Sequence, residues 1–474
     1  MDNNVTFNPY PKIAGKNRFS NFISKNRQLV EKLISAIGDQ AVFAGGNFII
    51  NVALARWMSI EEYGTFVLAY SWFLLFLSYY DAVIAEPMGV YGAGKYEAHF
   101  STYIGYLYYI HSVFTFLAFV ITVGISILVS RYDSISMGHA MLGVAIALPF
   151  ITLRWITRRP FYVLSQPIWS AIGGVIYILV TVSLVLGLHY IDVVNTNSFS
   201  VCPALLSVSE SLCLSLNTSS LLTPFSVIIL MSIGSLVSSG ILIVFVLRPT
   251  WRSQNKNFKI INVVKDHMSY GKWSGLNRFL IWFMVNIYYV VLPLTASLAA
   301  TGALKALMNL IMPVHLATAA VTALLTPIFV RAYKKNGKAG VTKDLKRYIV
   351  IISMICVPYF FIMIFFGKQV MTLLYDGQFD DIVTLPNLIL MGLLPVLTAI
   401  TRTFDSAILA MGGVKKVFLS KLIPGAITIF IGMPLLVQYG LLGANISALL
   451  SAIAGIFVLI YYYKNFSQIV QNPE

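Results

Sequence analysis

Long apolar stretches alternate with short polar ones along the whole chain. A membrane-spanning helix needs about 20 mostly apolar residues. Stretches of this kind lie at residues 36–57, 63–85, 101–129, 138–159, 167–189, 224–247, 272–297, 302–330, 345–367, 383–410, 417–439 and 441–463. A transmembrane β-barrel would instead show shorter segments in which apolar and polar residues alternate. The pattern therefore predicts an all-α integral membrane protein with about 12 transmembrane helices.

The composition agrees with a membrane chain. Of the 474 residues, 58% are hydrophobic and 11% are charged, whereas soluble domains carry roughly 25% charged residues. The mean hydropathy is +0.79. Such a chain has too little polar surface to cover a water-soluble globule of its size. We therefore exclude a soluble enzyme, a DNA-binding protein and a disordered tail.

The formal charge of +15 is explained by topology, and we expect no nucleic-acid partner. Cytoplasmic loops of membrane proteins are enriched in Lys and Arg. With the N-terminus placed inside, most basic residues fall on the cytoplasmic side, including Arg154, Arg158 and Arg159. The opposite side has only Arg56, Arg131 and Lys368. This asymmetry predicts a multi-pass protein with both termini cytoplasmic.

Weak internal repeats divide the chain into two six-helix lobes. Ile156-Thr157-Arg158 and Ile400-Thr401-Arg402 occupy equivalent places in the two halves. Because six helices return the chain to its starting side, the lobes are parallel repeats related by an axis along the membrane normal. Such lobes rock about a central substrate site. The predicted order is a cytoplasmic basic tail (1–35), an N-lobe (36–247) with an outer loop (190–223), a cytoplasmic basic linker (248–271), a C-lobe (272–463) and a cytoplasmic C-terminal tail (464–474).

The outer loop 190–223 is rich in Ser, Thr and Asn and carries no Lys or Arg. Cys202 and Cys213 lie in this loop and are the only cysteines that could pair with each other. The cysteines lack the Cys-x-x-Cys or Cys/His spacing of a metal site. We therefore expect no metal centre and no disulfide framework.

No catalytic motif is present in the sequence. It contains no Gly-rich loop of the kind that cradles phosphate before Lys-Ser/Thr, no His-Glu-x-x-His and no nucleophile elbow. We therefore expect no catalytic residues, no cofactor and no enzymatic activity. Any work that the protein does must draw on an ion gradient or on the gradient of its own substrate.

Charged residues at membrane depth are the best candidates for a binding site. Each costs several kcal/mol unless it faces a cavity or a partner. Arg278, Lys305 and Arg402 lie inside predicted helices and are predicted to bind an anionic head group, Arg by forked hydrogen bonds and Lys as a point charge. A simpler interpretation of Arg402 is also open, because Asp405 follows it by three residues and the two could pair.

Carboxylates within or near the predicted helices are candidates for coupling transport to H⁺ or Na⁺. They are Asp39, Asp81 and Asp405. Asp81 lies close to the inner end of its helix together with Glu86, so both could instead lie in the lipid headgroup region. For Asp405 the alternative interpretation is an ion pair with Arg402.

One segment near the start of the chain resembles a known family. The segment runs from Asn47-Phe48 through Asn51 and Ala53-Leu54-Ala55-Arg56 to Ser59-Ile60-Glu61-Glu62-Tyr63-Gly64-Thr65-Phe66. It is similar to the opening of polysaccharide biosynthesis, or O-antigen (Wzx-type), flippases of the multidrug/oligosaccharidyl-lipid/polysaccharide exporter superfamily. Leu374-Tyr375-Asp376-Gly377 and the two Ile-Thr-Arg repeats also fit this family.

The resemblance implies a MATE-like fold and a transport function. It implies that an undecaprenyl-pyrophosphate-linked oligosaccharide, the precursor of O-antigen, capsule or exopolysaccharide, moves from the cytoplasmic to the periplasmic leaflet by alternating access. It further implies a location in the bacterial cytoplasmic (inner) membrane among membrane lipids, beside a polysaccharide polymerase and a chain-length regulator. The outer loop 190–223 is longer and richer in Ser than the family leads us to expect.

Two other functions are compatible with the sequence. A MATE-type cation-coupled multidrug antiporter of the same architecture would favour an acidic cavity, against which Arg278, Lys305 and Arg402 argue. A membrane polysaccharide polymerase or ligase should carry Arg or His on a large outer loop, and the predicted loop has neither.

Overall fold

The computed structural model describes residues 27–92, 94–132, 134–164, 166–199, 220–244, 259–323 and 325–466. The cysteines Cys202 and Cys213, most of the predicted basic tail, most of the outer loop and the first part of the linker lie outside these residues. Within them the chain forms helices joined by short turns, and no β-strand occurs in the described ranges. The prediction of an all-α membrane protein is confirmed.

The first half of the chain contributes six long helices and several short ones. In order they are α2 (Arg27–Trp57), α3 (Ile60–Tyr80), the π-helical turn η1 (Asp81–Ala85), α4 (Glu86–Gly92), η2 (Glu97–His99), α5 (Phe100–Tyr132), α6 (Ile135–Val163), α7 (Pro167–Phe199) and α9 (Pro224–Leu242).

The second half is helical in the same way. Its elements are α10 (Ile260–Thr295), α11 (Leu298–Ala323), α12 (Leu325–Tyr375), α13 (Leu385–Ala410), α14 (Val414–Leu419), α15 (Leu422–Ile427), η6 (Thr428–Gly432) and α16 (Met433–Lys464).

Local sequence signals set several helix boundaries. Ser59 caps α3: its hydroxyl accepts a hydrogen bond from the Glu62 amide at 3.2 Å, and the Ser59 amide donates back to the Glu62 carboxylate at 3.2 Å. This reciprocal capping box satisfies two donors that a helix start leaves free. Thr223 and Ser226 form an equivalent pair at the start of α9.

Ten helices of the described residues are long and apolar enough to cross a membrane. One of these ten is the segment Lys415–Lys464. Its backbone breaks at Gly440, where φ is +53°. This break separates the predicted stretches 417–439 and 441–463, and only a residue without a Cβ adopts such a φ at little cost. The presence of twelve spans in two six-helix lobes stays a prediction.

Several predicted boundaries differ from the structure. Helix α2 begins at Arg27, within the predicted tail, and α7 extends to Phe199, within the predicted outer loop. Residues 260–271, expected in a linker, form the first turns of α10. The stretch 302–330 is divided between α11 and α12. The stretch 417–439 is interrupted by a turn at Ser420 and Lys421. In each case the hydropathy pattern reports how apolar a stretch is, and it does not report where the backbone turns or how far a polar helix extends.

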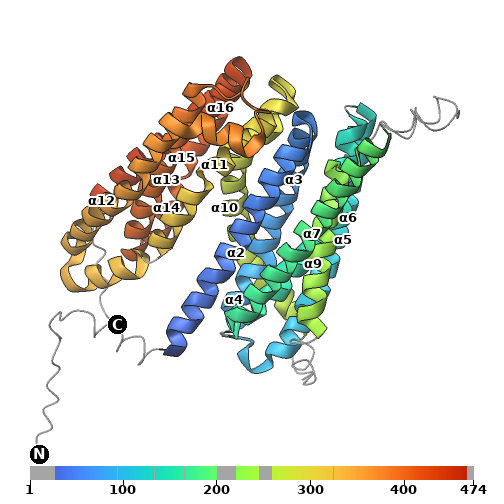
Figure 1. Ribbon diagram of the computed structural model, residues 1–474. Helices are drawn as coiled ribbons and strands as arrows, with labels where there is room; N and C mark the ends of the chain where they lie inside the picture. Colours follow the sequence, from blue (N-terminus) through green and yellow to red (C-terminus); the bar gives the residue numbers. More distant parts are fainter. Residues whose placement is uncertain are drawn as a thin grey trace, which may run out of the picture.

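Helices of the first half gather on one side of the molecule and most helices of the second half on the other (Figure 1). The two groups touch closely where α3 passes α11. A Cβ on Gly64 would lie 2.0 Å from the backbone oxygen of Leu298, so the absence of a side chain permits this approach. Tyr63 packs beside Gly302 at the same level.

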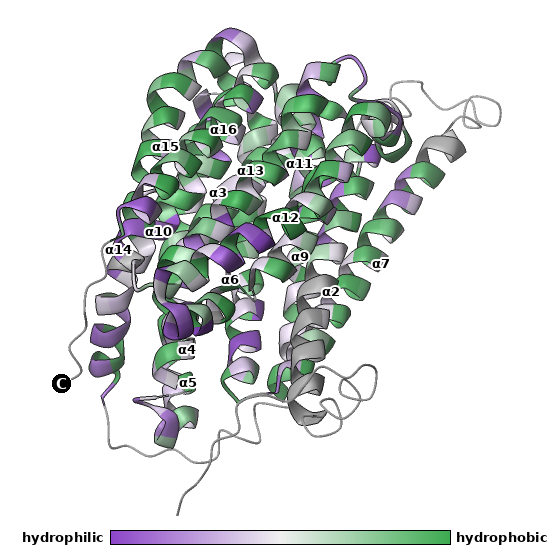
Figure 2. Cartoon of the chain, turned by 90° about the vertical axis from the view of Figure 1, so that its left-hand side faces the viewer, coloured by the Kyte–Doolittle hydropathy of each residue, from purple (hydrophilic) through white to green (hydrophobic). Residues whose placement is uncertain are grey.

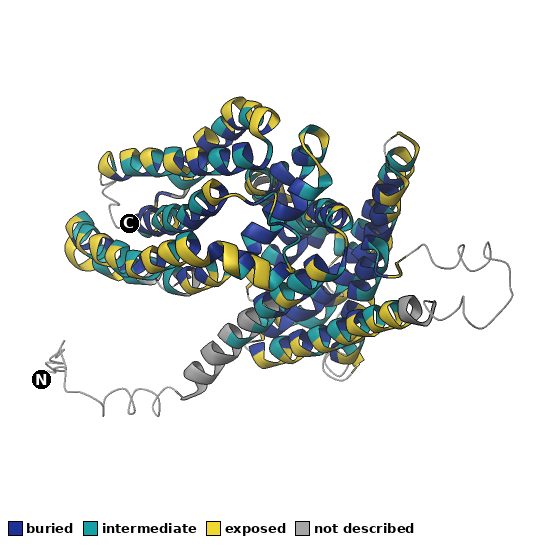
Figure 3. Cartoon of the chain, turned by 45° about the horizontal axis from the view of Figure 1, so that its top comes forward, coloured by how far each residue is buried: buried dark blue, intermediate teal, exposed yellow. Residues whose placement is uncertain are grey.

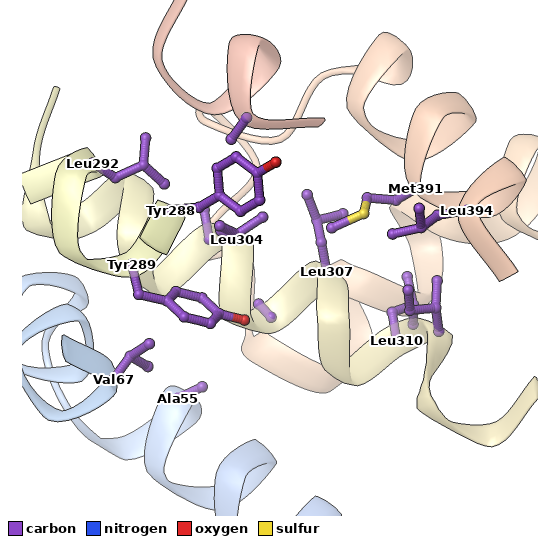
Figure 4. Close-up of a cluster of buried hydrophobic side chains, with 14 of the residues drawn as sticks. Ala55, Val67, Tyr288, Tyr289, Leu292, Leu304, Leu307, Leu310, Met391 and Leu394 are labelled. Carbon is purple, nitrogen blue, oxygen red and sulfur yellow. The ribbon is translucent and has the colours of Figure 1, made fainter. Parts of the chain in front are cut away.

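One large apolar core joins the two groups. Figure 4 shows part of it, where Ala55 and Val67 of the first half face Tyr289 of α10, and α11 packs against α13. Hydrophobic residues predominate along most of the long helices, and hydrophilic residues are more frequent toward the lower end of the view (Figure 2). Exposed residues lie on the outer sides of the peripheral helices, whereas buried residues concentrate where the helices meet (Figure 3). This distribution is the one expected when lipid covers an apolar rim.

Candidate functional site

A cavity of about 310 Å³ lies between the two halves of the chain. Helices α2, α3, α6, α7 and α9 form its walls on one side, and α11 forms the other. Its polar lining comes from Asn47 and Asn51 of α2, Arg154 of α6, and Lys305 and Asn309 of α11. Tyr70, Trp155 and Tyr177 add aromatic rings to the lining. We refer to this space as the central cavity.

Lys305 is half-buried and reaches the central cavity from α11. Its ammonium group makes no hydrogen bond and no ion pair within the part of the chain that the structure describes. A cation at membrane depth is costly unless it faces a partner or a water-filled space. The position of Lys305 therefore marks the central cavity as a place where an anion would be stabilised.

Arg154 reaches the same cavity from α6. Only 2% of the residue is exposed, and its guanidinium carbon lies 3.9 Å from the centre of the Tyr177 ring. This distance is that of a cation–π contact, which holds the planar group in one orientation. The sequence places Arg154 among the basic residues of the cytoplasmic side and does not single it out as a binding residue, whereas in the structure it lies inside α6. The usable signal was its place within the apolar stretch 138–159.

Amide side chains add neutral hydrogen-bonding groups. The Asn51 amide nitrogen donates to the Asn47 backbone oxygen at 2.8 Å, and its buried Oδ1 has no hydrogen-bond donor among the described residues. The Asn309 amide nitrogen donates to the Tyr63 hydroxyl at 3.3 Å. Asn51 can therefore still accept a hydrogen bond from a hydroxyl group in the cavity.

The charge of the central cavity is positive. The described residues that line it include Arg154 and Lys305 and no Asp or Glu. In a low-dielectric surrounding such a site favours an anion over a cation. Amides and aromatic rings beside the two cations suit a ligand that also carries hydroxyl groups and sugar faces.

Arg278, the first of the three predicted binding residues, lies in a different place. Its guanidinium lies 2.8 Å from the Asp81 carboxylate and 3.5 Å from the Glu86 carboxylate. Asp81 also pairs with Arg159 at 2.8 Å, and Glu86 accepts a hydrogen bond from Ser274 at 2.7 Å. This ionic cluster joins α10 to η1, α4 and α6, so two carboxylates already neutralise Arg278.

Arg402 lines a second cavity, formed wholly by the second half of the chain. Asp405 and Lys421 line the same cavity and pair with each other at 2.6 Å. The simpler interpretation, an ion pair of Arg402 with Asp405, is not what the structure shows, since Lys421 takes that place. Arg278, Lys305 and Arg402 therefore do not meet in one cavity.

The predicted coupling residues are distributed in a similar way. Asp81 and Asp405 both form ion pairs with basic side chains. The side chain of Asp39 lies outside the described residues, although its backbone belongs to α2.

Comparisons with known proteins agree with this architecture. The model of a family described as polysaccharide biosynthesis protein matches residues 195–384. No curated protein matches the sequence. Among solved structures, the chain is similar to the lipid II flippase MurJ in an inward closed conformation, with 13% identity, a TM-score of 0.66, and coverage of 92% of this chain and 88% of that one.

Two further structures have the same fold. The MATE multidrug transporter DinF-BH is 11% identical with a TM-score of 0.62, over 93% of this chain and 95% of that one. A MOP superfamily transporter from Pyrococcus furiosus, described as having a binding pocket of reverse polarity, is 13% identical with a TM-score of 0.55, over 93% of this chain and 97% of that one. The fold is thus the one shared by MurJ and MATE transporters. The family model matches the middle part of the chain, and the likeness to the solved structures shows the fold.

Proposed function

We propose that this chain is a flippase for an undecaprenyl-pyrophosphate-linked oligosaccharide, a unit of O-antigen, capsule or exopolysaccharide. It moves the unit from the cytoplasmic to the periplasmic leaflet of the bacterial inner membrane by alternating access. The family match over residues 195–384 and the MurJ-like fold support a lipid-linked substrate. A polysaccharide polymerase and a chain-length regulator are its proposed partners.

One observation carries the proposal: Lys305 and Arg154 line one cavity between the two halves, and no described lining residue is acidic. A pyrophosphate is the anionic part of the proposed substrate. Lys305 supplies a point charge for it, and Arg154 supplies a planar fork that can bind two phosphate oxygens. Asn51 and Asn309 are placed to meet sugar hydroxyls, and Trp155 and Tyr70 can pack against sugar rings.

Alternating access requires contacts between the halves that form and break. Two sets of contacts meet this description. At one level Tyr63 and Gly64 of α3 pack on Leu298 and Gly302 of α11. At the other, Arg278 of α10 binds Asp81 and Glu86. We propose that these two sets alternate during the cycle, so that the central cavity opens to one leaflet at a time.

Coupling to H⁺ or Na⁺ is part of the proposal, with Asp39, Asp81 and Asp405 as candidates. At Asp81 and Asp405, existing ion pairs restrict how a coupling ion could bind. A coupling ion at Asp81 would have to displace Arg159 or Arg278, and one at Asp405 would have to displace Lys421. Exchange of ion-pair partners is therefore the form of coupling that these two carboxylates allow.

The alternatives fit the cavity less well. A MATE-type multidrug antiporter that takes up cationic compounds needs a carboxylate in its binding site, and the described lining of the central cavity offers two cations instead. The fold and the family match favour a transporter over a polysaccharide polymerase or ligase.

The test measures lipid-linked oligosaccharide in cells that lack the gene and are complemented with variants. Wild type should clear the intermediate from the inner leaflet. Lys305→Met should let it accumulate, because the anion loses a counter-charge, and Lys305→Arg should restore much of the clearance. Lys368→Met provides the matched control, since it removes a lysine from α12 that does not line the central cavity.

Two results would contradict the proposal. In the first, surface polysaccharide and lipid-linked intermediates are unchanged in the deletion strain while sensitivity to cationic dyes rises, which favours the antiporter. In the second, Lys305→Met clears the intermediate as well as wild type does, which removes the cationic cavity from the mechanism. Equal amounts of each variant in the membrane fraction must be verified by immunoblot.

A further inference from the structure

The second half of the chain contains its own cavity of about 360 Å³, separate from the central cavity. Helices α10, α11, α13, α15 and α16 line it, together with Lys421. Helix α11 lies between the two cavities: it presents Lys305 and Asn309 to the central cavity and Met308 to this one. We call this second space the α13 cavity, because α13 runs along its length.

The lining of the α13 cavity changes from apolar to charged along α13. Leu394 lies at one level, and Arg402 follows eight residues later, which corresponds to roughly 12 Å along a helix. Ile281 and Met284 of α10 and Ala452 of α16 continue the apolar wall. A single space that is apolar at one end and charged at the other fits a molecule with the same division.

The charged end has a net positive charge. Asp405 and Lys421 pair at 2.6 Å and neutralise each other. Arg402 is exposed and forms no hydrogen bond or ion pair in the described ranges. Its guanidinium is therefore the group that remains to bind an anion.

The hydroxyl groups of Thr398, Thr401 and Ser451 in the wall already donate to backbone oxygens. The Thr401 hydroxyl donates to the Leu397 backbone oxygen at 2.9 Å, and the Ser451 hydroxyl donates to the Pro424 backbone oxygen at 3.0 Å. Thr398 likewise donates to the Pro395 backbone oxygen at 3.1 Å. Hydrogen bonding to a ligand thus concentrates at Arg402, and the rest of the cavity can accept an apolar chain.

We propose that the α13 cavity is a second binding site, for an anionic amphiphile in which a phosphate group is attached to a long apolar chain. The phosphate binds Arg402, and the chain lies along Leu394, Met284 and Ala452. Two sources share this chemistry: a polyprenyl phosphate and an anionic phospholipid of the bilayer. The site does not depend on Lys305, so it stands apart from the proposed pyrophosphate site in the central cavity.

The test uses the purified full-length protein in phosphatidylcholine nanodiscs and a farnesyl phosphate analogue with a photoreactive diazirine in its chain. Cross-linked peptides are mapped by mass spectrometry. Labelling is expected on α10, α13 and α16, and unlabelled farnesyl phosphate should compete for it better than farnesol or inorganic phosphate does. Competition by undecaprenyl phosphate and by phosphatidylglycerol, compared at equal mole fraction, distinguishes the two sources.

Variants separate the two cavities. Arg402→Gln should weaken competition by farnesyl phosphate by roughly tenfold or more, as expected when a charge-assisted hydrogen bond is lost, and should leave competition by farnesol unchanged. Ala452→Phe places a bulky ring in the apolar part of the α13 cavity. It should weaken competition by farnesyl phosphate and also competition by farnesol. Lys305→Gln should leave labelling of α13 and α16 as it is in wild type.

Three results would overturn the second site. One is unchanged labelling in Arg402→Gln. Another is labelling confined to α2, α3, α6 and α11 that Lys305→Gln abolishes, which would place the amphiphile in the central cavity and leave the proposed function intact. The third is equal competition by farnesol and farnesyl phosphate in wild type. Melting temperatures of the variants verify that each remains folded.

Discussion

Arg278 of α10 and Asp81 of η1 lie 2.8 Å apart, although nearly two hundred residues separate them in the chain. Asp81 is 11% exposed and also pairs with Arg159, whereas Arg278 is 38% exposed and also reaches Glu86. Asp81 is thus the shared acceptor of two cations. A single carboxylate at the π-helical turn holds α6 and α10 together, and π-helical turns are frequent at functional positions.

This arrangement predicts unequal effects of two substitutions. Asp81→Asn leaves both Arg159 and Arg278 without the shared charge, so it should destabilise the protein by about 2–3 kcal/mol. This is less than the loss of a fully buried pair, because both arginine side chains are more than a third exposed and solvent screens them. Arg278→Gln should cost about 1 kcal/mol or less, since Arg159 still neutralises Asp81. Thermal unfolding of the two variants and of the double variant, as a cycle, measures both effects. Equal losses in the single variants would contradict the shared-acceptor role.

The contact between α3 and α11 predicts a strong effect at Gly64. Gly64→Ala places a Cβ about 2.0 Å from the Leu298 backbone oxygen, and backbone must move to relieve the overlap. A loss of about 1–3 kcal/mol is expected, as for overpacked cores. Gly105→Ala is the control, because nothing lies within 4 Å of its Cβ and the site is helical. Thermal unfolding compares the two; a neutral Gly64→Ala would show that the helices can separate freely.

The stacking of Arg154 on Tyr177 predicts that a positive charge at position 154 is not enough for transport, and that the planar guanidinium is needed as well. Arg154→Lys keeps the positive charge but loses the planar fork and its contact with the ring. Clearance of lipid-linked oligosaccharide should therefore fall by roughly tenfold, whereas Tyr177→Phe, which keeps the ring, should have a much smaller effect. If Arg154→Lys clears the intermediate at the wild-type rate, Arg154 supplies only charge.

His267 predicts a dependence of stability on pH. It lies in the first turns of α10, where Nδ1 lies 2.7 Å from the Val83 backbone oxygen and Nε2 lies 2.7 Å from the Tyr103 hydroxyl. Burial lowers the pKa of His267 below its usual 6.5, and this outweighs the opposing effects of the Val83 oxygen and of Asp266. The folded state therefore prefers neutral imidazole.

The sign of the effect follows from the lowered pKa. The unfolded chain binds more protons below pH 6.5 than the folded chain does, so stability is complete above that pH and declines as pH falls toward the folded pKa. Melting temperatures between pH 7.5 and pH 5.5 should fall more in wild type than in His267→Gln. Identical slopes in the two proteins would contradict a role for this histidine.

Much of the fold could be predicted from the sequence. The apolar stretches identify the helices, and the boundary between 439 and 441 coincides with the break at Gly440. The extension of α10 back to Ile260 was missed, because residues 260–271 mix apolar and charged positions. Their charges find partners only in the folded chain: Lys95 binds the Asp266 carboxylate at 2.7 Å, and Tyr96 donates to it at 2.6 Å.

The candidate site could be predicted only in part. Lys305 was found because a charge inside an apolar stretch is conspicuous, and the structure places it in the central cavity. Arg154 lies within the predicted stretch 138–159 but is not among the predicted binding residues, because its basic neighbours Arg158 and Arg159 make it part of the cytoplasmic charge pattern. Arg278 and Arg402 were grouped with Lys305, but the structure places them in an ionic cluster and in a second cavity.

By itself, the sequence determined that this chain is an all-helical membrane protein with cations at membrane depth, because transfer of apolar surface from water depends on composition and length. Tertiary structure alone decided which cations face an open cavity and which are neutralised. That outcome depends on how each helix is rotated and which helix it meets, and side chains from distant parts of the chain, such as Asp81 beside Arg278, supply the neutralising charges.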